Sequence, residues 1–316
     1  MIGINVLSLF DGHSTGYLAL KDANIEVDNY FASEIDEGAI QISKNNFGDK
    51  IIRIGDVTKL NLNMLPKIDL LIGGSPCQGF SRNGKCLNFD DPRSKLFFDY
   101  VKILEWLKKN NNCDIRFLLE NVEMKKEWRN VISEYLKTDY KLINSKLVSA
   151  QNRPRLYWTN FEYEIPNDKN ILLKDILQDI NDSNYVTYKN LKIDPQISKK
   201  CYELIDVVNG EVRIKQATKQ GYIVANNGDG INLQFPTSKT RRGRVIKEKS
   251  NTLDCSCDVC VYIDGVIRRF TINELERLQT LPDGYTNGLS EKKRIKAIGN
   301  GWTKDVITEI FKQLKF

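Results

Sequence analysis

Short apolar runs alternate with helix-compatible stretches along the first half of the chain. The apolar runs lie at 4–10, 30–33, 51–54, 69–72 and 116–119. Helix-compatible stretches follow at 17–23, at 37–45 and after Ser94, where the apolar positions of one helical face are Phe97, Tyr100, Val101, Leu104 and Leu107. This alternation predicts an α/β fold with an open, mostly parallel sheet.

Each predicted strand ends in polar or glycine-rich residues. The first runs into Asp11, the second ends at Glu34 and the third at Asp56. The fourth opens into a loop that contains Cys77, and the fifth closes with Glu120. Because open parallel sheets bind ligands at the carboxyl ends of their strands, these side chains are expected to surround one crevice.

The alternation stops near residue 162, and residues 163–267 show short, irregular, turn-rich segments. Order returns at Thr271, where a capping box with Glu274 predicts a helix start, and a last helix is expected from Thr303. The sequence therefore predicts a first domain at 1–162, a second at 163–267, and a C-terminal segment, 268–316, that returns to the first domain.

Composition narrows the class of protein. The chain has 316 residues, 41% of them hydrophobic and 28% charged, with no apolar run long enough to span a membrane. No basic residues precede the apolar start, so it is read as a buried strand and not as a signal peptide. Together with seven cysteines, an odd number, this favours a cytoplasmic protein with reduced thiols.

Charge alone does not define a partner. The net charge of +6 permits a polyanionic ligand without requiring one. Whether the chain binds such a ligand therefore depends on local clusters of basic residues. Cys255, Cys257 and Cys260 have a spacing that suggests zinc, but a closed site needs four ligands and the single histidine, His13, lies far away in the sequence. No metal is expected.

The first strand-to-helix turn favours a nucleoside-containing ligand. Gly12 and Gly16 bracket the turn, and Glu34 follows Gly12 by 22 residues, where a ribose-binding carboxylate belongs. Asp56 could accept a hydrogen bond from an adenine amino group. The turn lacks the glycine spacing of dinucleotide-binding folds, which ranks a dehydrogenase last among the alternatives.

Cys77 stands out among the cysteines because it follows Pro76 in a glycine-flanked loop at a strand end. A buried, inert thiol is the usual reading of a cysteine. Here Glu120 closes the neighbouring predicted strand, and Arg153 and Arg155 occupy alternate positions of an extended segment. A thiol, a carboxyl group and two guanidinium groups are therefore expected to converge.

These motifs, in their order, resemble the cytosine-5 DNA methyltransferases. The resemblance rests on Leu9-Phe10-Asp11-Gly12 with Thr15-Gly16, Gly74-Ser75-Pro76-Cys77-Gln78, Glu120-Asn121-Val122, Gln151-Asn152-Arg153-Pro154-Arg155, the helix around Glu274, and Gly299-Asn300-Gly301-Trp302. It covers nearly the whole chain except 163–267. His13, Ser14 and Ser75 depart from the residues of many relatives, which leaves the cofactor contact of the first turn open but removes no reacting group.

The resemblance implies a Rossmann-like S-adenosylmethionine-dependent methyltransferase sheet with helices on both faces. Cys77 would add to carbon 6 of cytosine, Glu120 would hold or protonate ring nitrogen 3, and Arg155, with Arg153 nearby, would contact the base. The cofactor pocket would be lined by Phe10, Asp11, Gly12, Thr15, Glu34, Ile35, Asp56, Val57, Pro76, Leu96, Asn300 and Trp302.

The resemblance also implies double-stranded DNA as the partner, with the target base flipped out of the helix and the loop 81–95 closing over it. Residues 163–267 would be the target recognition domain. The candidate DNA contacts are Ser81, Arg82, Asn83, Lys239, Arg241, Arg242 and Arg244, with Lys247 and Lys249 as further candidates. A monomer is expected, and a cognate restriction endonuclease could act on the same sequence.

Two other functions stay open at this point. The tRNA-methylating branch of the same family shares Cys77, Glu120 and the arginine pair, and methyl transfer to tRNA would distinguish it. A catalytically silent relative that only binds DNA would bind the cofactor without forming an adduct at Cys77. Retention of all four reacting residues argues against this second alternative.

Overall fold

The computed structural model describes residues 3–76, 95–180, 184–255 and 259–316. Its core is a seven-stranded sheet in the order β3-β2-β1-β4-β5-β7-β6. The strands are β1 (Ile4–Leu9), β2 (Val27–Ser33), β3 (Ile51–Arg53), β4 (Leu70–Gly74), β5 (Arg116–Val122), β6 (Tyr140–Asn144) and β7 (Pro154–Thr159). The first five are parallel, and β7 pairs antiparallel with both β5 and β6.

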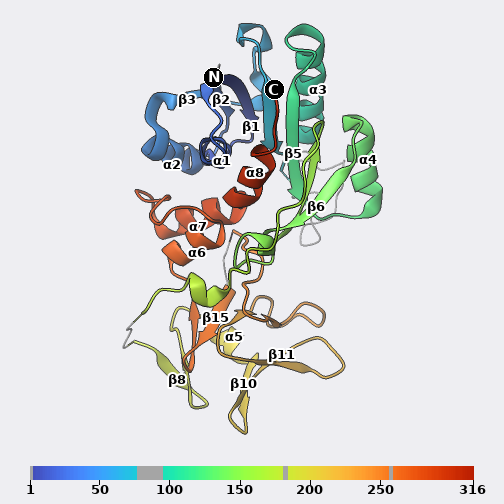
Figure 1. The fold of residues 1–316 in the computed structure, drawn as a ribbon. Coiled ribbons are helices and arrows are strands. Elements are labelled where there is room, and N and C mark those ends of the chain that lie inside the picture. The colour runs from blue at the N-terminus through green and yellow to red at the C-terminus, as the bar shows by residue number, and fades with distance from the viewer. Residues whose placement is uncertain (1–2, 77–94, 181–183, 256–258) are drawn as a thin grey trace.

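Helices cover both faces of this sheet, as expected (Figure 1). One face packs against α3 (Lys95–Asn110) and α4 (Lys126–Leu136). The other packs against α1 (Thr15–Asp22) and α8 (Lys304–Phe311). The alternation of side chains along β5 explains the two layers, since Phe117 and Leu119 face the first cluster and Leu118 faces the second. The predicted α/β class is confirmed.

The segment expected to be irregular contains two sheets. A three-stranded sheet comprises β10 (Ile205–Val208), β11 (Glu211–Lys215) and β12 (Tyr222–Ala225). A six-stranded sheet has the order β14-β13-β15-β16-β9-β8, formed by β8 (Val186–Tyr188), β9 (Leu191–Ile193), β13 (Asp229–Asn232), β14 (Arg244–Ile246), β15 (Val259–Ile263) and β16 (Val266–Arg269). The boundary expected after residue 267 lies inside β16. We call residues 163–267, which contain most of these two sheets, the target domain.

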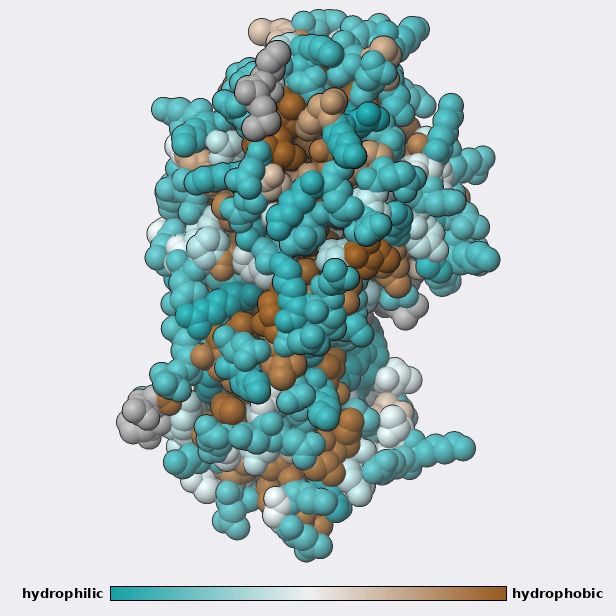
Figure 2. All heavy atoms as spheres, in the orientation of Figure 1, coloured by the Kyte–Doolittle hydropathy of each residue, from teal (hydrophilic) through white to brown (hydrophobic). Residues whose placement is uncertain are grey.

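The target domain and the large sheet meet at α6 (Ile272–Leu278) and α7 (Glu291–Asn300), which lie between them in Figure 1. A hydrophobic cluster at this junction includes Leu253 and Val261 from the target domain, Leu275 from α6 and Ile298 from α7. On the face shown in Figure 2, brown hydrophobic residues are visible among teal hydrophilic ones in the middle of the molecule, where the two parts meet. The short remaining helices are α5 (Lys199–Tyr202), η1 (Gly48–Lys50), η2 (Val57–Lys59), η3 (Leu62–Met64), η5 (Ser145–Leu147) and η6 (Leu173–Asp175).

A buried ion pair fixes the start of α6. Both nitrogens of the Arg268 fork donate to the Glu274 carboxylate at 2.8 Å, and the Glu274 side chain is fully buried. Glu274 also completes the predicted capping box, because it accepts from the backbone N–H of Thr271 at 2.8 Å. Both carboxylate oxygens of Glu274 are thus hydrogen-bonded at the point where the chain returns from the target domain.

We expect Arg268→Met to lower the free energy of unfolding by about 3–5 kcal/mol, because it leaves the buried Glu274 carboxylate without its counter-ion. Urea denaturation would measure the change. The matched control is Arg213→Met, which removes a 2.7 Å pair with Glu211 on the surface and should change the free energy of unfolding far less, because solvent screens this pair. Equal effects of the two substitutions would contradict this interpretation.

Candidate active site

A hollow of about 600 Å³ lies at the carboxyl ends of the parallel strands. Its wall contains Phe10 and Gly12 after β1, Glu34 after β2, Pro76 after β4, and Glu120 on β5. The opposite wall is formed by Gly299 and Asn300 at the end of α7 and by Gly301, which follows the helix. The crevice that the polar strand ends predict is therefore present, and its size is typical of a small-molecule site.

Glu120 is held by two donors at the edge of this hollow. Arg155 Nε lies 3.1 Å from Glu120 Oε1, and Trp302 Nε1 donates to Glu120 Oε2 at 3.0 Å. The Glu120 and Arg155 side chains are only 12% and 13% exposed. Gly74 faces the same group, because a Cβ there would lie 2.8 Å from Trp302 Nε1 and 2.9 Å from Glu120 Oε2. The carboxylate is thus fixed in direction while the hollow stays open beside it.

Glu34 organises the turn that carries the first cluster. Its Oε2 accepts from the Gly12 backbone N–H at 2.8 Å, and its Oε1 accepts from Ile35 and Asp36 at 2.7 and 2.8 Å. Since a carboxylate has about four acceptor positions, one remains for a ligand hydroxyl. Ile35 is 72% exposed beside it and offers an apolar surface to the hollow.

The structure brings half of the expected cofactor residues to the hollow. The residues that line it are Phe10, Gly12, Glu34, Ile35, Pro76 and Asn300. The others lie outside the lining: Asp11, Thr15, Asp56, Val57, Leu96 and Trp302. Val57 and Leu96 pack with the α3 cluster, and Asp56 caps η2 by accepting from the Thr58 backbone. That hydrogen bond holds the pKa of Asp56 below its usual value.

Asp11 lies beneath the turn and not in the hollow. Its side chain is fully buried and accepts from Ser14 at 2.5 Å and from the Tyr30 hydroxyl at 2.7 Å, and Arg53 lies 3.5 Å away. Burial raises the pKa of Asp11, although these hydrogen bonds and Arg53 oppose the rise. Thr15 is buried as well, with its hydroxyl 3.1 Å from His13 Nδ1. Both residues shape the turn from behind.

Arg153 lines the same hollow as Glu120 and Arg155, and its guanidinium is bound to backbone carbonyls. It is 3% exposed, and Nη1 donates to the Leu253 carbonyl at 2.7 Å. Its Nη2 donates to the carbonyls of Gly299 and Gly301, both at 3.0 Å. Of the two expected arginines, Arg155 therefore approaches Glu120, and Arg153 joins segments of backbone.

Sequence reasoning missed several lining residues. His13, Gly38 and Ala39 belong to the turn and to the start of α2 (Glu37–Phe47), and Lys293 and Lys296 belong to α7. Two signals were available for α2, namely the helical pattern at 37–45 and Asp36, whose side chain caps the helix by accepting from the Ala39 N–H. No comparable signal marks α7.

The candidate DNA contacts of the target domain lie in and beside the loop between β13 and β14. Lys239, Arg241 and Arg244 are exposed, and the Arg241 guanidinium lies 4.9 Å from the centre of the exposed Phe235 ring. Arg242 is partly buried.

Lys249 is not available to DNA. Its ammonium donates to the carbonyls of Lys146 and Ser149 at 3.1 and 3.2 Å and also to that of Ile171, which uses its three donors. Burial lowers the pKa of Lys249. The lysine anchors the target domain to the first domain.

Some expectations fall outside the described residues. These are Cys77, Ser81, Arg82 and Asn83, the loop 81–94 and Cys257. Cys255 is exposed and Cys260 is buried on β15. Within 3–76, 95–180, 184–255 and 259–316, no group of three His, Cys, Asp or Glu side chains could hold a metal ion. No helix in those ranges has the length and apolar character that crossing a bilayer requires.

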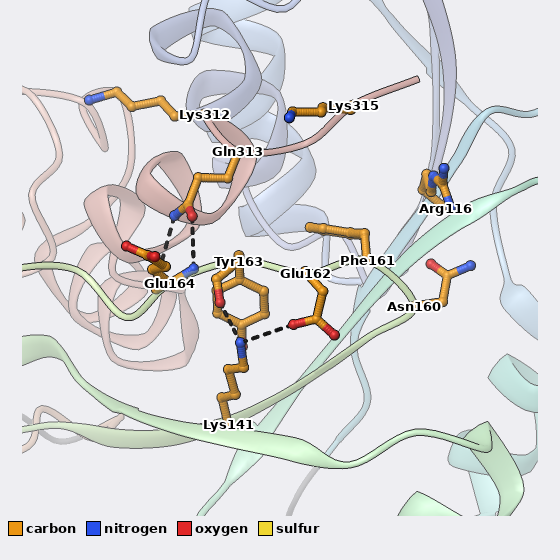
Figure 3. A pocket seen from close by; sticks show the side chains of 10 residues that line it. All are labelled: Arg116, Lys141, Asn160, Phe161, Glu162, Tyr163, Glu164, Lys312, Gln313 and Lys315. Atoms are coloured by element: carbon orange, nitrogen blue, oxygen red, sulfur yellow. Dashed lines mark hydrogen bonds and ion pairs between the residues drawn. The ribbon is translucent and has the colours of Figure 1, made fainter.

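A second hollow, of about 900 Å³, lies at the other end of the large sheet and contains none of the candidate reacting residues (Figure 3). Arg116 at the start of β5 and Lys315 near the C-terminus are part of its wall. Lys141 points to the Tyr163 carbonyl and to the Glu162 carboxylate, 3.6 Å away. This second hollow is the larger of the two, but Glu120, Arg155 and the turn that contains Gly12 all lie at the smaller one.

Comparison with known proteins decides the family. The model of the C-5 cytosine-specific DNA methylase family matches residues 4–316. The chain belongs to this family. It is accordingly a DNA cytosine-5 methyltransferase by class, as the order of its motifs indicated.

The relatives agree with this assignment. The chain is 29% identical over 303 residues to the type II methyltransferase M1.ScrFI of Lactococcus lactis subsp. cremoris, covering 87% of this chain and 69% of that protein. It is 28% identical over 330 residues to the type II methyltransferase M.NlaX of Neisseria lactamica, covering 98% and 96%. A prophage-encoded E. coli protein described as a DNA modification methyltransferase shares the fold, with a TM-score of 0.63, 22% identity and 98% coverage of both chains.

We expect acid to destabilise the methyltransferase through His13, which lines the hollow and is 2% exposed. Burial lowers the pKa of His13 to about 4, whereas an unfolded histidine titrates near 6.5. Between about pH 6.5 and about pH 4, His13 is protonated in the unfolded state and neutral in the folded state. The free energy of unfolding therefore falls by up to about 3 kcal/mol as the pH drops through this range.

The measurement is the free energy of unfolding in urea between pH 7.5 and pH 4.5, for the wild type and for His13→Gln. Carboxyl groups titrate in both proteins, so the difference between their pH profiles isolates the histidine. The expected result is a steeper loss of stability for the wild type below pH 6.5. Parallel profiles would mean that His13 is not buried as a neutral ring.

Proposed function

We propose that this methyltransferase transfers a methyl group from S-adenosylmethionine to carbon 5 of cytosine in a specific duplex DNA sequence. The observation that carries the proposal is the Glu120 carboxylate, fixed by Arg155 and Trp302 at the edge of the hollow. Pro76 lines the same hollow, and Cys77 is the next residue in the sequence. A carboxyl group, a guanidinium group and a thiol are thus available to one bound base.

The residues around the first turn fit S-adenosylmethionine, which supplies the methyl group. Glu34 retains one acceptor position for a ribose hydroxyl, and the exposed Ile35 side chain beside it fits the apolar face of an adenine. Phe10 and the backbone of Gly12 complete this part of the wall. Asp11 and Trp302 support the site from outside the lining.

The chain's own residues would activate carbon 5. The Cys77 thiolate forms a bond with carbon 6, and Glu120, in its protonated form, donates a hydrogen bond or its proton to ring nitrogen 3, so that the electrons of the carbon 5–carbon 6 double bond become nucleophilic at carbon 5. After carbon 5 has taken up the methyl group, with S-adenosylhomocysteine as the leaving group, water takes the carbon 5 proton, the sulfur–carbon bond breaks, and the ring and the thiolate are restored. Arg155, paired with Glu120, stabilises the charge at this position.

DNA would enter between the hollow and the target domain. A cytosine inside the duplex cannot reach the hollow, so the base is flipped out before reaction. Lys239, Arg241, Arg242 and Arg244 are the proposed DNA contacts of the target domain, 163–267, and Ser81, Arg82 and Asn83 are those of the loop after Cys77. The enzyme would act in the cytoplasm as a monomer, with a cognate endonuclease as its partner in a restriction-modification system.

Methyl transfer to nucleic acid tests this function. Labelled S-adenosylmethionine is offered with unmethylated genomic DNA and with total tRNA to the wild type, to Cys77→Ala and to the control Cys113→Ala, which changes an exposed cysteine. We expect 5-methylcytosine in DNA at one short sequence with the wild type and the control. Loss of the nucleophile should reduce transfer by roughly a thousandfold or more.

Two results would contradict the proposal. Label found only in tRNA would place the enzyme in the tRNA-methylating branch. Label in neither nucleic acid, with S-adenosylhomocysteine still bound, would identify a silent relative that keeps the fold and the cofactor pocket.

A further inference from the structure

A segment of the target domain lies directly against the first domain. Residues 250–255, here called the return segment, run beside residues 150–153. The Ser250 N–H donates to the Ala150 carbonyl at 2.7 Å, and the Asn152 N–H donates to the Ser250 carbonyl at 2.8 Å. The Leu253 N–H donates to the buried Gln151 side chain at 3.0 Å. The return segment is therefore held like a short added strand.

The return segment also forms the back of the hollow's wall. A Cβ on Gly299 would lie 2.2 Å from the Asp254 carbonyl oxygen and 3.0 Å from the Cys255 nitrogen, so the two backbones touch and no side chain fits between them. The Cys255 thiol donates to Asn300 Oδ1 at 2.9 Å. Gly299 and Asn300 line the hollow on their other side. A displacement of the return segment must therefore move this wall.

Arg153 joins the two pieces. Its planar fork donates to Leu253 in the return segment and to Gly299 and Gly301 in the wall. Such a geometry suits arginine specifically, because lysine offers one nitrogen at the place where arginine offers several fixed N–H groups. At 3% exposure the group has little contact with solvent, which strengthens these bonds.

The far side of the return segment contacts the proposed DNA-binding loop. Gln234 Nε2 donates to Asp254 Oδ2 at 2.7 Å. Gln234 immediately precedes Phe235, whose ring lies under the Arg241 guanidinium. One chain of contacts thus runs from the loop through Gln234 and Asp254 to the wall of the hollow.

We propose that Arg153 is a positioning residue that couples DNA binding at the loop 235–244 to cofactor binding in the hollow, and that Gln234 with Asp254 transmits the coupling. The inference rests on the proposed function. By linkage, if DNA tightens cofactor binding by a given factor, the cofactor tightens DNA binding by the same factor. Arg153 lines the hollow beside Gly299 and Gly301, and because its guanidinium is committed to these carbonyls it acts by positioning the wall and not on the base.

The test measures the affinity for S-adenosylhomocysteine by calorimetry, with and without saturating unmethylated amplified genomic DNA. For the wild type we expect DNA to tighten binding by about fivefold or more. In Gln234→Met, the affinity without DNA should stay within about twofold and the effect of DNA should fall below about twofold. Thr237→Ala, an exposed position in the same loop, is the matched control and should keep the wild-type effect.

Arg153→Lys tests the clamp itself. Because at least one charged hydrogen bond to the wall is lost, we expect the affinity for S-adenosylhomocysteine without DNA to fall by about tenfold. The kcat at saturating cofactor should stay within about threefold, while the KM for S-adenosylmethionine rises. This separation distinguishes a positioning residue from one that touches the base.

Several outcomes would overturn the inference. An unchanged affinity in Arg153→Lys with a large loss of kcat would show that Arg153 acts on the base. A wild type that binds S-adenosylhomocysteine equally well with and without DNA would refute the coupling and leave the proposed function intact. A wild type that binds no S-adenosylhomocysteine at all would refute both. If Arg153→Lys does not fold, Gln234→Met alone decides the coupling.

Discussion

The site depends on the fixed carboxylate of Glu120. A carboxyl group that is 12% exposed needs hydrogen-bond partners for its oxygens, and here one oxygen meets Arg155 and the other meets Trp302. Arg155 comes from β7, the antiparallel neighbour of β5, and Trp302 comes from the C-terminal segment. Three parts of the chain must therefore be in place before the carboxylate points to the hollow, which links catalysis to complete folding of the first domain.

A second constraint is the way the target domain is attached. Arg153 donates to the Leu253 carbonyl of the return segment, and Lys249, the residue just before that segment, donates to the Lys146 and Ser149 carbonyls of the first domain. Carbonyl groups are present whatever the side chain, so such clamps fix the path of the backbone independently of the side chains in the return segment.

The sequence predicted the parts of the fold with strong local patterns. The parallel strands, the strand-end polar clusters and the capping box of α6 were readable because apolar alternation and cap residues are local signals. Helix α7 was not readable, since its buried residues Ile295 and Ile298 are too few among charged neighbours to show a period. The role of Arg153 could not be read either, because its carbonyl acceptors lie 100 and 146 residues away in the sequence. Asp11 and Trp302 were expected in the pocket by resemblance, whereas the structure has them outside the lining of the hollow, with Trp302 bonded to Glu120.

The central claim is that Cys77 forms a bond with a cytosine that Glu120 activates. The most direct measurement is trapping on duplex DNA in which cytosine is replaced by 5-fluorocytosine, whose carbon 5 has no proton to lose after methylation. With S-adenosylmethionine present, the account predicts a denaturation-resistant protein–DNA complex whose peptide map places the DNA on Cys77, and none with Cys77→Ala. A complex attached to another cysteine, such as Cys255, or methylation of ordinary DNA without any trapped complex, would contradict it.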